Sequence, residues 1–547
     1  MKKTFLLLIM FVTFGYATTN AQTTITVKDS LTSDQHWTSD NFYLLQGFVY
    51  VLDGVTLTID SGTVIKGDHT FTGSALIIRK GAKINANGTK SRPIIFTSDQ
   101  PAGSRVRGDW GGVIICGKAP INSTGGSANI EGGPYAPYGG TDASDNSGVL
   151  SYVRIEWAGY PFQPNKEING LTFGGVGNGT TIDHVQVSYS NDDSFEWFGG
   201  TVNAKYLIAF RGWDDEFDTD FGWSGMNQFL VGLRDSSVAD ISGSNGFESD
   251  NDGTGSSNTP ITQGIMCNVS LFGPKATMTN PVNPLFKRAM HIRRNSKLSV
   301  YNSVFMGWPT GLMIDGKNTT WVNAQNNELQ IENCIMSGMT STKFFAVGSG
   351  GWADAADSIA GIGNIRTWYN SVAKNNDTLA SNDLMYITDP FNYSGPDFLP
   401  TGSSPVLGHG SFTNTRLQDA FFTPVTFAGA FGTEDWTSGW ANWDPQNTVY
   451  STTSSISETN NSGIAVESNV PNPFAGSTSI YFSVNSNRHI KIEIYDVTGK
   501  KIATIFDQDV QMSNNKVEWN ASSYPKGMYF AKISSDSGYK TLKMIAQ

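Results

Sequence analysis

An acidic and aromatic motif recurs at a short interval in the middle of this chain. Asp192-Asp193-Ser194-Phe195-Glu196 returns 22 residues later as Asp214-Asp215-Glu216-Phe217-Asp218. A third copy, Gly246-Phe247-Glu248, follows 30 residues after the second. A repeat of about 20–25 residues, each copy pairing with the next, is typical of a solenoid. The turns of a parallel β-helix pair in this way, at a strand spacing of about 4.8 Å.

Strand-like segments support this architecture over much of the chain. Ile155-Glu156-Trp157 precedes Phe195-Glu196-Trp197 by 40 residues, and the segment 302–307 is similar to 333–338. Short apolar runs end at Gly, Asn or Asp, the chain contains 59 Gly, and long helical patterns are scarce. These features indicate an all-β protein. We predict a right-handed parallel β-helix, which is a solenoid, over residues 22–345.

The N-terminus has the features of a secretory signal peptide, which we assign to residues 1–21. Lys2 and Lys3 precede an apolar run at 5–14, and Ala21 provides a small residue for cleavage. The apolar run is too short for a stable membrane anchor. No later segment is long and apolar enough either, so we expect no transmembrane segment and a secreted protein.

Beyond the predicted solenoid the sequence changes character three times. Residues 346–450 are irregular and rich in Trp and Gly, and we expect them to cap the β-helix by folding against its last turns. Helical spacing within 357–377 predicts a helix capped by Asp357. Residues 451–465 are rich in Ser, Thr and Asn, which is typical of a flexible linker. Residues 466–547 alternate apolar and polar residues, which predicts an immunoglobulin-like β-sandwich.

The last segment carries several motifs in a characteristic order. They are Asn472-Pro473-Phe474, Ile494-Tyr495-Asp496-Val497-Thr498-Gly499-Lys500, Lys526-Gly527-Met528-Tyr529-Phe530 and Lys540-Thr541-Leu542-Lys543-Met544. With these motifs the segment resembles the type A C-terminal sorting domain of the type IX secretion system of Bacteroidetes. The resemblance implies passage across the outer membrane by the type IX secretion machinery, followed by release or attachment to the cell surface. The body of the chain resembles parallel β-helix proteins secreted by the same bacteria, which implies architecture more than activity.

The composition limits the classes of partner. The formal net charge is −11, and removing the signal peptide with its two lysines makes it more negative. This charge argues against nucleic acid and anionic membranes as partners. Neutral glycans, cations or no ligand at all remain as candidate partners. Cys116, Cys267 and Cys334 are odd in number and far apart, so we expect buried hydrophobic residues and no disulfide framework.

Five carboxylates crowd into the segment 214–220. With a 22-residue period the carboxylates of adjacent turns, such as Glu196 and Asp218, would stack. Like charges directly opposed in a sheet are destabilising. Three arrangements relieve the repulsion: a bound cation, a carboxyl group that keeps its proton at a raised pKa, or an ion pair with Arg154 or Arg211.

Calcium fits the first arrangement, because it takes several oxygen ligands from Asp, Glu and main-chain carbonyls. The segment 246–254 partly resembles a calcium-binding loop, although it lacks the final acid. The alternative is that these acids lie in solvated turns with no ligand. The predicted calcium ligands are Asp214, Asp215, Asp218, Asp220, Glu248, Asp250 and Asp252.

The same acids are candidates for catalysis. Sugar hydrolysis with inversion uses two carboxyl groups about 6.5–9.5 Å apart, one as acid and one as base. The catalytic candidates are Asp193, Asp215 and Asp218. A lyase would need a basic residue in the groove, for which the candidates are Arg288, Arg293 and Arg294.

Tryptophans next to these acids are candidates for stacking on sugar rings. Trp197, Trp213 and Trp223 are the predicted ligand-binding residues, although a Trp in a strand is more commonly part of a core. We expect a noncatalytic surface or adhesion protein that binds glycan with the support of calcium. The alternative is a polysaccharide lyase or glycoside hydrolase that uses the acids of 192–220.

Overall fold

The computed structural model describes residues 23–163, 166–450, 464–484, 486–497, 499–511, 514–535 and 538–547. The predicted signal peptide and all but the last two residues of the predicted linker lie outside this part of the chain. Within the described residues, no helix has both the length and the apolar character needed to span a bilayer.

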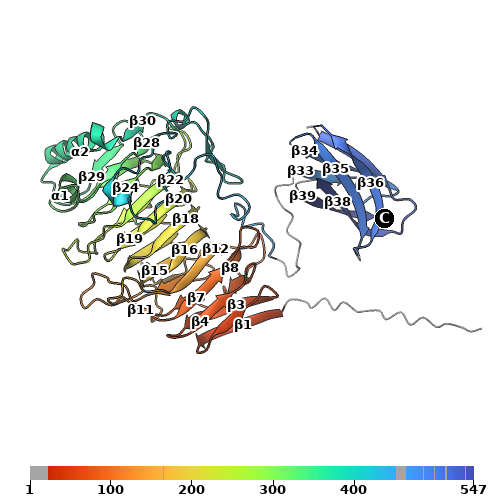
Figure 1. Ribbon diagram of the computed structural model, residues 1–547, viewed down its shortest axis with the longest axis horizontal. Coiled ribbons are helices and arrows are strands. Elements are labelled where there is room, and N and C mark those ends of the chain that lie inside the picture. Colours follow the sequence, from red (N-terminus) through yellow and green to blue (C-terminus); the bar gives the residue numbers. More distant parts are fainter. Residues whose placement is uncertain are drawn as a thin grey trace, which may run out of the picture.

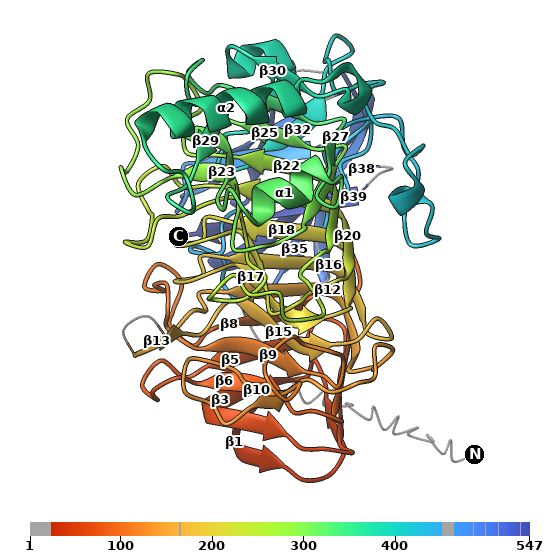
Figure 2. The ribbon, with the colours of Figure 1, turned by 90° about the vertical axis from the view of Figure 1, so that its left-hand side faces the viewer.

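Parallel strands stack turn upon turn in three columns, as Figures 1 and 2 show. The first column contains β2 (Gln35–Trp37), β4 (Thr56–Ile59), β7 (Lys83–Asn87), β12 (Gly148–Glu156), β16 (Thr181–Ser188), β18 (Asn203–Phe210), β20 (Met226–Leu233), β22 (Ile265–Phe272), β24 (Ser299–Tyr301) and β27 (Ile331–Glu332). This arrangement is a parallel β-helix, and it confirms the predicted solenoid.

The longest strands bend and continue into the second column. That column contains β1 (Thr23–Leu31), β3 (Asn41–Val51), β5 (Val64–Gly67), β8 (Ile94–Ser98), the second halves of β12, β16, β18, β20 and β22, and then β25 (Val304–Met306), β28 (Ile335–Ser337) and β30 (Asp377–Leu379). The last of these strands lies beyond residue 345, within the segment predicted to form the cap.

The third column positions the site described below. It contains the second half of β3, then β6 (Ala75–Ile78), β9 (Gly112–Cys116), β15 (Leu171–Val176), β17 (Phe195–Gly200), β19 (Phe217–Asp220), β21 (Phe247–Ser249), β23 (Arg288–Ile292), β26 (Thr310–Ile314) and β29 (Phe345–Val347).

The bend between the first two columns is made by residues in the left-handed conformation. They are Tyr152, His184, Tyr206, Phe229, Asn268, Asn302 and Asn333, with φ between 49° and 62°. This conformation costs about 1–2 kcal/mol for a residue with a side chain, although Asn tolerates it well. Where aromatic residues occupy the bend they stack, with ring centroids 4.4 Å apart for Tyr152 and His184 and 4.3 Å apart for His184 and Tyr206. The stacking offsets the backbone strain and keeps adjacent turns aligned.

Aromatic residues also stack inside the β-helix. Phe195 pairs with Phe217 on the next turn, and their buried rings lie 5.5 Å apart and nearly parallel. Phe217 in turn pairs with Phe247. The predicted 22-residue register is therefore confirmed. The predicted alignment of Glu156 with Glu196 is wrong, because Glu156 pairs with Ser188 in the second column.

A helix and a long return along the side follow the last turns of the stack. α1 (Thr320–Gln325) lies earlier, in the connection between β26 and β27, whereas α2 (Ala355–Tyr369) follows β29 and lies at the C-terminal end of the stack (Figure 2). Asp354, and not Asp357, caps α2, because its side chain accepts the Asp357 backbone N–H. Three short helices follow, η1 (Val372–Lys374), η2 (Asn382–Met385) and η3 (Thr415–Leu417).

The rest of the predicted cap does not stay at the last turns. Asn268 donates a hydrogen bond to the Phe427 carbonyl, and Gln186 donates one to the Asn442 carbonyl. The Gly103 N–H donates to the carbonyl of Gln446. Residues 427–446 therefore run back along the β-helix from late turns to early turns.

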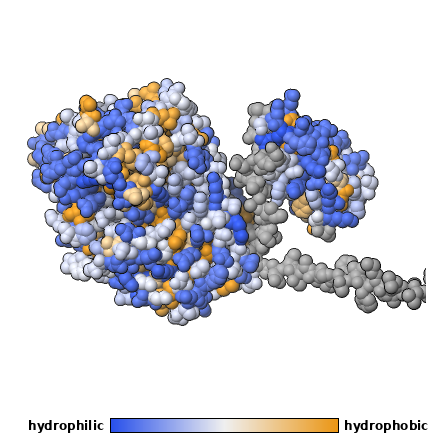
Figure 3. Space-filling view, in the orientation of Figure 1, coloured by the Kyte–Doolittle hydropathy of each residue, from blue (hydrophilic) through white to orange (hydrophobic). Residues whose placement is uncertain are grey.

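Short pairs of antiparallel strands extend from the β-helix, and a separate C-terminal unit follows it. The pairs are β10 (Ala128–Asn129) with β11 (Pro137–Tyr138), β13 (Pro161–Gln163) with β14 (Lys166–Glu167), and β31 (Ile387–Asp389) with β32 (Asp397–Pro400). The C-terminal unit has two antiparallel sheets. One contains β33 (Ile464–Val470), β34 (Ser477–Val484) and β37 (Asn514–Asn520). The other contains β36 (Lys501–Val510), β35 (Arg488–Asp496), β38 (Gly527–Ser535) and β39 (Gly538–Ala546). Its own buried core confirms the predicted β-sandwich. On the face seen in Figure 3, hydrophilic residues predominate and hydrophobic patches are small.

Candidate functional site

A cavity of about 820 Å³ opens beside the third column of strands. Its carboxylates are Glu131, Asp192, Asp193, Glu196, Asp214, Asp215, Asp218, Asp220, Asp240, Glu248 and Asp250. Arg288, Arg293 and Arg294 also line it. We call this cavity the acidic cavity. The repeat brings together residues that are distant in sequence, so carboxylates from successive turns face one space.

The register of β17, β19 and β21 forms one row of acids. Glu196 pairs with Asp218, Asp218 pairs with Glu248, and Glu248 pairs with His291 of β23. Their neighbours on the same strands are the stacked aromatic residues of the interior. Because side chains alternate along a strand, these charged residues face outward.

A second row of acids lies in the turns before these strands. The Asp215 N–H donates to Asp193 Oδ1 over 2.8 Å, and the Asn245 N–H donates to Asp215 Oδ1. Each of these carboxylates therefore uses one oxygen to hold the next turn. The arrangement explains why aspartates recur at this position. Asp215 also accepts a hydrogen bond from Asn245 Nδ2 with its Oδ2, over 3.3 Å.

Burial makes the charged form of these acids unfavourable. Burial, reinforced by neighbouring carboxylates, raises the pKa of Asp193, Glu196, Asp215 and Asp218 well above the ordinary value. Burial also raises the pKa of Asp220 to about 8, with Asp250 adding to the shift. These carboxyl groups hold protons more readily than exposed ones, or they require positive charge beside them.

Two buried carboxylate oxygens have no hydrogen-bond partner among the described residues. They are Oδ1 of Asp214 and Oδ1 of Asp218. A buried polar atom without a partner typically costs about 1–3 kcal/mol. Both atoms belong to the acidic cavity, so an additional positively charged or hydrogen-bonding group would stabilise them.

The spacing of the carboxylates suits a metal ion. Three groups each place one oxygen per residue within 4.8 Å of the others: Asp192, Asp193 and Asp214; Asp193, Glu196 and Asp218; and Asp215, Asp218 and Glu248. Oxygens that share a calcium ion at about 2.3–2.6 Å lie at most about 5 Å apart. The donor set consists of hard oxygen ligands, which calcium prefers. The residues present therefore fit the predicted cation.

Arginines neutralise the other end of the acidic cavity. Arg293 forms ion pairs with Glu248 and, over 2.7 Å, with Asp250. Arg294 also pairs with Asp250, over 2.7 Å. The His291 ring lies 2.9 Å from Glu248. The positive side chains therefore neutralise mainly Glu248 and Asp250, and the carboxylates around Asp218 have the least positive charge beside them.

The predicted arginine partners are wrong. Arg211 pairs with Asp235, and Arg154 lies 3.8 Å from Glu156. Neither pair belongs to the acidic cavity. The sequence pattern did not identify the partners in the cavity, because Arg293 and Arg294 follow the acids they neutralise by more than 40 residues. Glu216 of the segment 214–220 pairs instead with the fully buried Arg234, over 3.0 Å.

One predicted calcium ligand lies apart from the others. Asp252 does not line the acidic cavity, and its carboxylate accepts hydrogen bonds from Thr254 and Ser256 within its own loop. The segment 246–254 contains strand β21, so it does not form a calcium-binding loop of its own. The remaining predicted ligands, from Asp214 to Asp250, line one cavity.

Two of the three predicted sugar-binding tryptophans are core residues. Trp197 and Trp223 are fully buried, with ring centroids 5.5 Å apart inside the β-helix. They cannot stack on a ligand, so that prediction is wrong. Trp213 lines the acidic cavity, and its Nε1 donates to Asp240 Oδ1 over 3.0 Å. Trp197 lies in β17 with its ring turned inward. Trp223 lies in the connection between β19 and β20, where its Nε1 donates to the Val202 carbonyl. Trp213 lies in a connecting turn that faces the cavity.

The catalytic candidates Asp193, Asp215 and Asp218 all line the acidic cavity. Carboxylate oxygens within each cluster lie closer together than the separation that inversion requires. Sequence reasoning missed Glu131 and Asp240, which also line the cavity. Both come from loops outside the repeat, and no signal in the sequence places them there.

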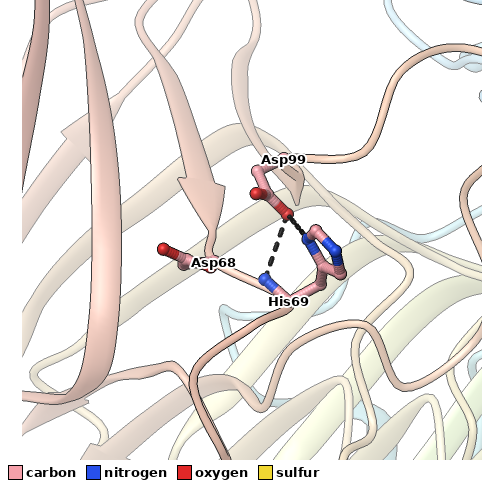
Figure 4. Close-up of side chains that lie close together, drawn as sticks. All are labelled: Asp68, His69 and Asp99. Carbon is pink, nitrogen blue, oxygen red and sulfur yellow. Dashed lines mark hydrogen bonds and ion pairs between the residues drawn. The ribbon is translucent and has the colours of Figure 1, made fainter.

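A smaller acidic and histidine cluster lies elsewhere on the β-helix (Figure 4). His69 Nδ1 lies 2.7 Å from Asp99 Oδ1, and the His69 N–H donates to the same oxygen. Asp68 accepts hydrogen bonds from Thr70 and Gln46 with its two oxygens. The protein itself satisfies these groups, so nothing in the cluster calls for a metal ion.

Comparisons with known proteins agree with this architecture. The family described as pectate-lyase-like β-helix domain matches residues 29–370, and the secretion system C-terminal sorting domain matches residues 470–547. No curated protein matches the chain. The sorting domain is of the type IX kind, so the chain is handled by the type IX secretion machinery and is secreted or displayed at the cell surface. Over more than half of its length, the chain belongs to the pectate-lyase-like β-helix family.

Proposed function

We propose that this protein binds calcium in the acidic cavity and, with its support, binds polysaccharide at or beyond the cell surface. One observation carries the proposal: buried carboxylates from adjacent turns form groups with oxygens within 4.8 Å, and Asp214 Oδ1 and Asp218 Oδ1 lack partners. A divalent cation would satisfy these oxygens and relieve the repulsion between the turns.

The form of the acidic cavity supports a role in binding. Calcium takes about six to eight oxygens, so carboxylates on the protein side leave positions for the oxygens of a ligand. Sugar hydroxyl and carboxylate groups supply such oxygens. Trp213 in the wall of the cavity and Ile241, a residue that is 83% exposed, provide apolar surfaces for the C–H faces of a sugar.

Calorimetric titration of calcium into the mature chain tests the proposal. We expect the wild-type chain to bind calcium and Asp218→Asn to bind at least about tenfold more weakly, because Asp218 belongs to two of the three clusters. Glu434→Gln removes one exposed carboxylate outside the cavity and serves as the control. Absence of calcium binding by the wild-type chain would refute the proposal.

A catalytic role is the second candidate, and Arg288 is the observation that favours it. This half-buried arginine lines the acidic cavity and forms no ion pair with the described residues. Burial lowers its pKa, which makes it a better base than an exposed arginine. Beside carboxylate-bound calcium, such a base is suited to proton abstraction from an acidic sugar.

Product analysis separates the two candidates. A lyase releases unsaturated sugars from an acidic polysaccharide, and Asp215→Asn and Asp218→Asn would each abolish that release. Calcium-dependent binding to the same polysaccharide with no release of product would identify a noncatalytic binding protein.

A further inference from the structure

A second cavity of about 610 Å³ adjoins the acidic cavity. The two cavities share Asn191 and Trp213 in their walls. The second cavity is lined by Arg105, Arg107, Val106, Trp157, Tyr189, Arg211, Asp444, Gln446 and Asn447, together with the two shared residues. We call it the basic cavity, because three arginines surround it.

The repeat builds one wall of the basic cavity. Trp157, Tyr189 and Arg211 follow β12, β16 and β18 at equivalent positions, and all three have left-handed backbone with φ between 55° and 66°. The rings of Trp157 and Tyr189 stack with centroids 4.2 Å apart, and the Arg211 guanidinium lies 5.0 Å from the Tyr189 ring centroid. The wall is therefore a rigid stack of aromatic and cationic groups.

Two of the three arginines already form polar contacts with other residues of the protein. Arg211 pairs with Asp235, which lies outside the lining of the cavity. Arg105 donates hydrogen bonds to the carbonyls of Pro445 and Thr448. These contacts fix the edges of the basic cavity but leave the positive charge of Arg105 without a carboxylate partner among the described residues.

The guanidinium group of Arg107 has a hydrogen-bond donor and a charge that the described residues leave without a hydrogen-bond or ion-pair partner. It donates to the Arg211 carbonyl over 2.8 Å and forms no ion pair with the described residues. Its Nε is buried and has no hydrogen-bond partner in this part of the chain, and the same is true of Trp157 Nε1. Burial lowers the pKa of Arg107 to about 10, and the nearby Arg211 adds to the shift while Asp235 opposes it. A negative charge in the cavity would stabilise this guanidinium.

The acids near the basic cavity do not supply that charge. Asp444 is the carboxylate in its lining, and it is exposed and accepts hydrogen bonds from Asn447. Asp235 is occupied by Arg211 and Ser237. Among the described residues, the arginines of the basic cavity therefore outnumber the carboxylates that could neutralise them. The neighbouring acidic cavity has the opposite charge.

We propose that the basic cavity binds a carboxylate or sulfate group of an acidic saccharide, and that the saccharide crosses Trp213 to reach the acidic cavity. Arg107 would supply a charged donor and Trp157 Nε1 a neutral one. The contact with the acidic cavity rests on the proposed function, because a bound cation would let a second anionic group of the saccharide approach those carboxylates. The anion site itself does not depend on calcium.

The test is a set of calorimetric titrations on the mature chain, each in calcium and in chelator. The probes are a uronic acid oligosaccharide, a sulfated oligosaccharide and a neutral oligosaccharide of equal length. We expect tighter binding of at least one acidic probe than of the neutral one. The uronate and sulfate arms show which oxyanion the cavity prefers.

Arg107 variants identify the basic cavity as the site. Arg107→Gln is expected to weaken binding of the acidic probe about tenfold or more in both buffers, which is the usual size of a lost charge-assisted hydrogen bond. Arg107→Lys keeps the charge and should recover part of the affinity. Arg366→Gln, on the exposed side of α2, should change nothing. Circular dichroism verifies that each variant is folded.

The outcomes separate this inference from the proposed function. Equal affinity for acidic and neutral probes, no binding of either acidic probe, or an Arg107→Gln affinity equal to that of the wild type would overturn the inference. If calcium fails to bind while binding in chelator still depends on Arg107, the inference stands and the proposed function fails. If Arg107→Gln binds calcium normally and loses the acidic probe, both stand.

Discussion

At the scale of single residues, the acids of the repeat have two roles. Asp193 and Asp215 each use one carboxylate oxygen to accept a backbone N–H of the following turn. Asp218 has no such structural bond, and its Oδ1 is buried without a partner among the described residues. Its negative charge is therefore available to the cation that we propose for the acidic cavity.

Asp218→Asn is expected to raise the melting temperature of the metal-free protein. The substitution keeps the shape of the side chain and removes a charge that burial and the neighbouring Glu248 and Asp215 make unfavourable. Thermal unfolding in chelator measures the change. Calcium should stabilise the wild type and should have a much smaller effect on the variant. A variant that melts below the wild type in chelator would contradict this explanation.

The metal-free protein is expected to lose stability as the pH rises from about 5 to 8. Burial raises the pKa of Asp220 to about 8, with the carboxylates of Asp250 and Asp252 adding to the shift and Arg294 and the Phe221 N–H opposing it. The unfolded chain releases this proton near the ordinary aspartate pKa of 3.8, so over this range the folded state binds more protons. Stability must therefore fall with rising pH.

Denaturant unfolding in chelator at several pH values measures this slope. Asp220→Asn cannot titrate, so its stability should fall less steeply between pH 5 and pH 8 than that of the wild type. Identical slopes for the two proteins would show that Asp220 does not titrate in this range.

At the scale of strands and turns, the 22-residue repeat fixes both the core and the site. The same strand that turns Phe217 inward turns Asp218 outward, so the register of the aromatic stack determines the register of the acids. Packing in the interior therefore positions the carboxylates of the acidic cavity.

Phe217→Ala is expected to lower the free energy of unfolding by about 3–5 kcal/mol, as for other fully buried aromatic residues. Phe217 is fully buried, stacks on Phe195 and packs against the tilted ring of Phe247. Denaturant unfolding measures the loss, and Phe71→Ala is the control because Phe71 is 46% exposed. Equal stability of the two variants would show that the aromatic stack does not support the turn.

The sequence predicts the repeat better than the surroundings of the site. Phe195 and Phe217 are 22 residues apart and have the same acidic neighbours, so their stacking was predictable. The repeated pair of Phe and acid also aligned Phe247, which follows 30 residues later. The match of Glu156 to Glu196 failed because similar residue pairs occur in two different columns of strands. Glu131 enters the cavity from a loop between β10 and β11, and loop paths depend on tertiary contacts that follow no period.

At the scale of the whole molecule, the chain joins two units with separate roles. The β-helix carries both cavities, and the C-terminal sandwich has its own hydrophobic core and matches a sorting domain. A unit with its own core can be removed without exposing the core of its neighbour.

Truncation after residue 463 is expected to abolish secretion and to leave the melting transition and calcium affinity of the β-helix unchanged. Fractionation of the producing cells measures the first effect, and calorimetry of the purified chain measures the second. Normal secretion of the truncated chain would contradict the role of the sorting domain, and loss of calcium binding would show that the two units depend on each other.

We propose that the clustered carboxylates of adjacent turns hold calcium, and anomalous diffraction from crystals grown with calcium would reveal the ion itself. We expect a peak within about 2.3–2.6 Å of carboxylate oxygens of Asp218 and at least one other member of its clusters. Well-ordered clusters with no anomalous peak, at saturating calcium and neutral pH, would contradict it.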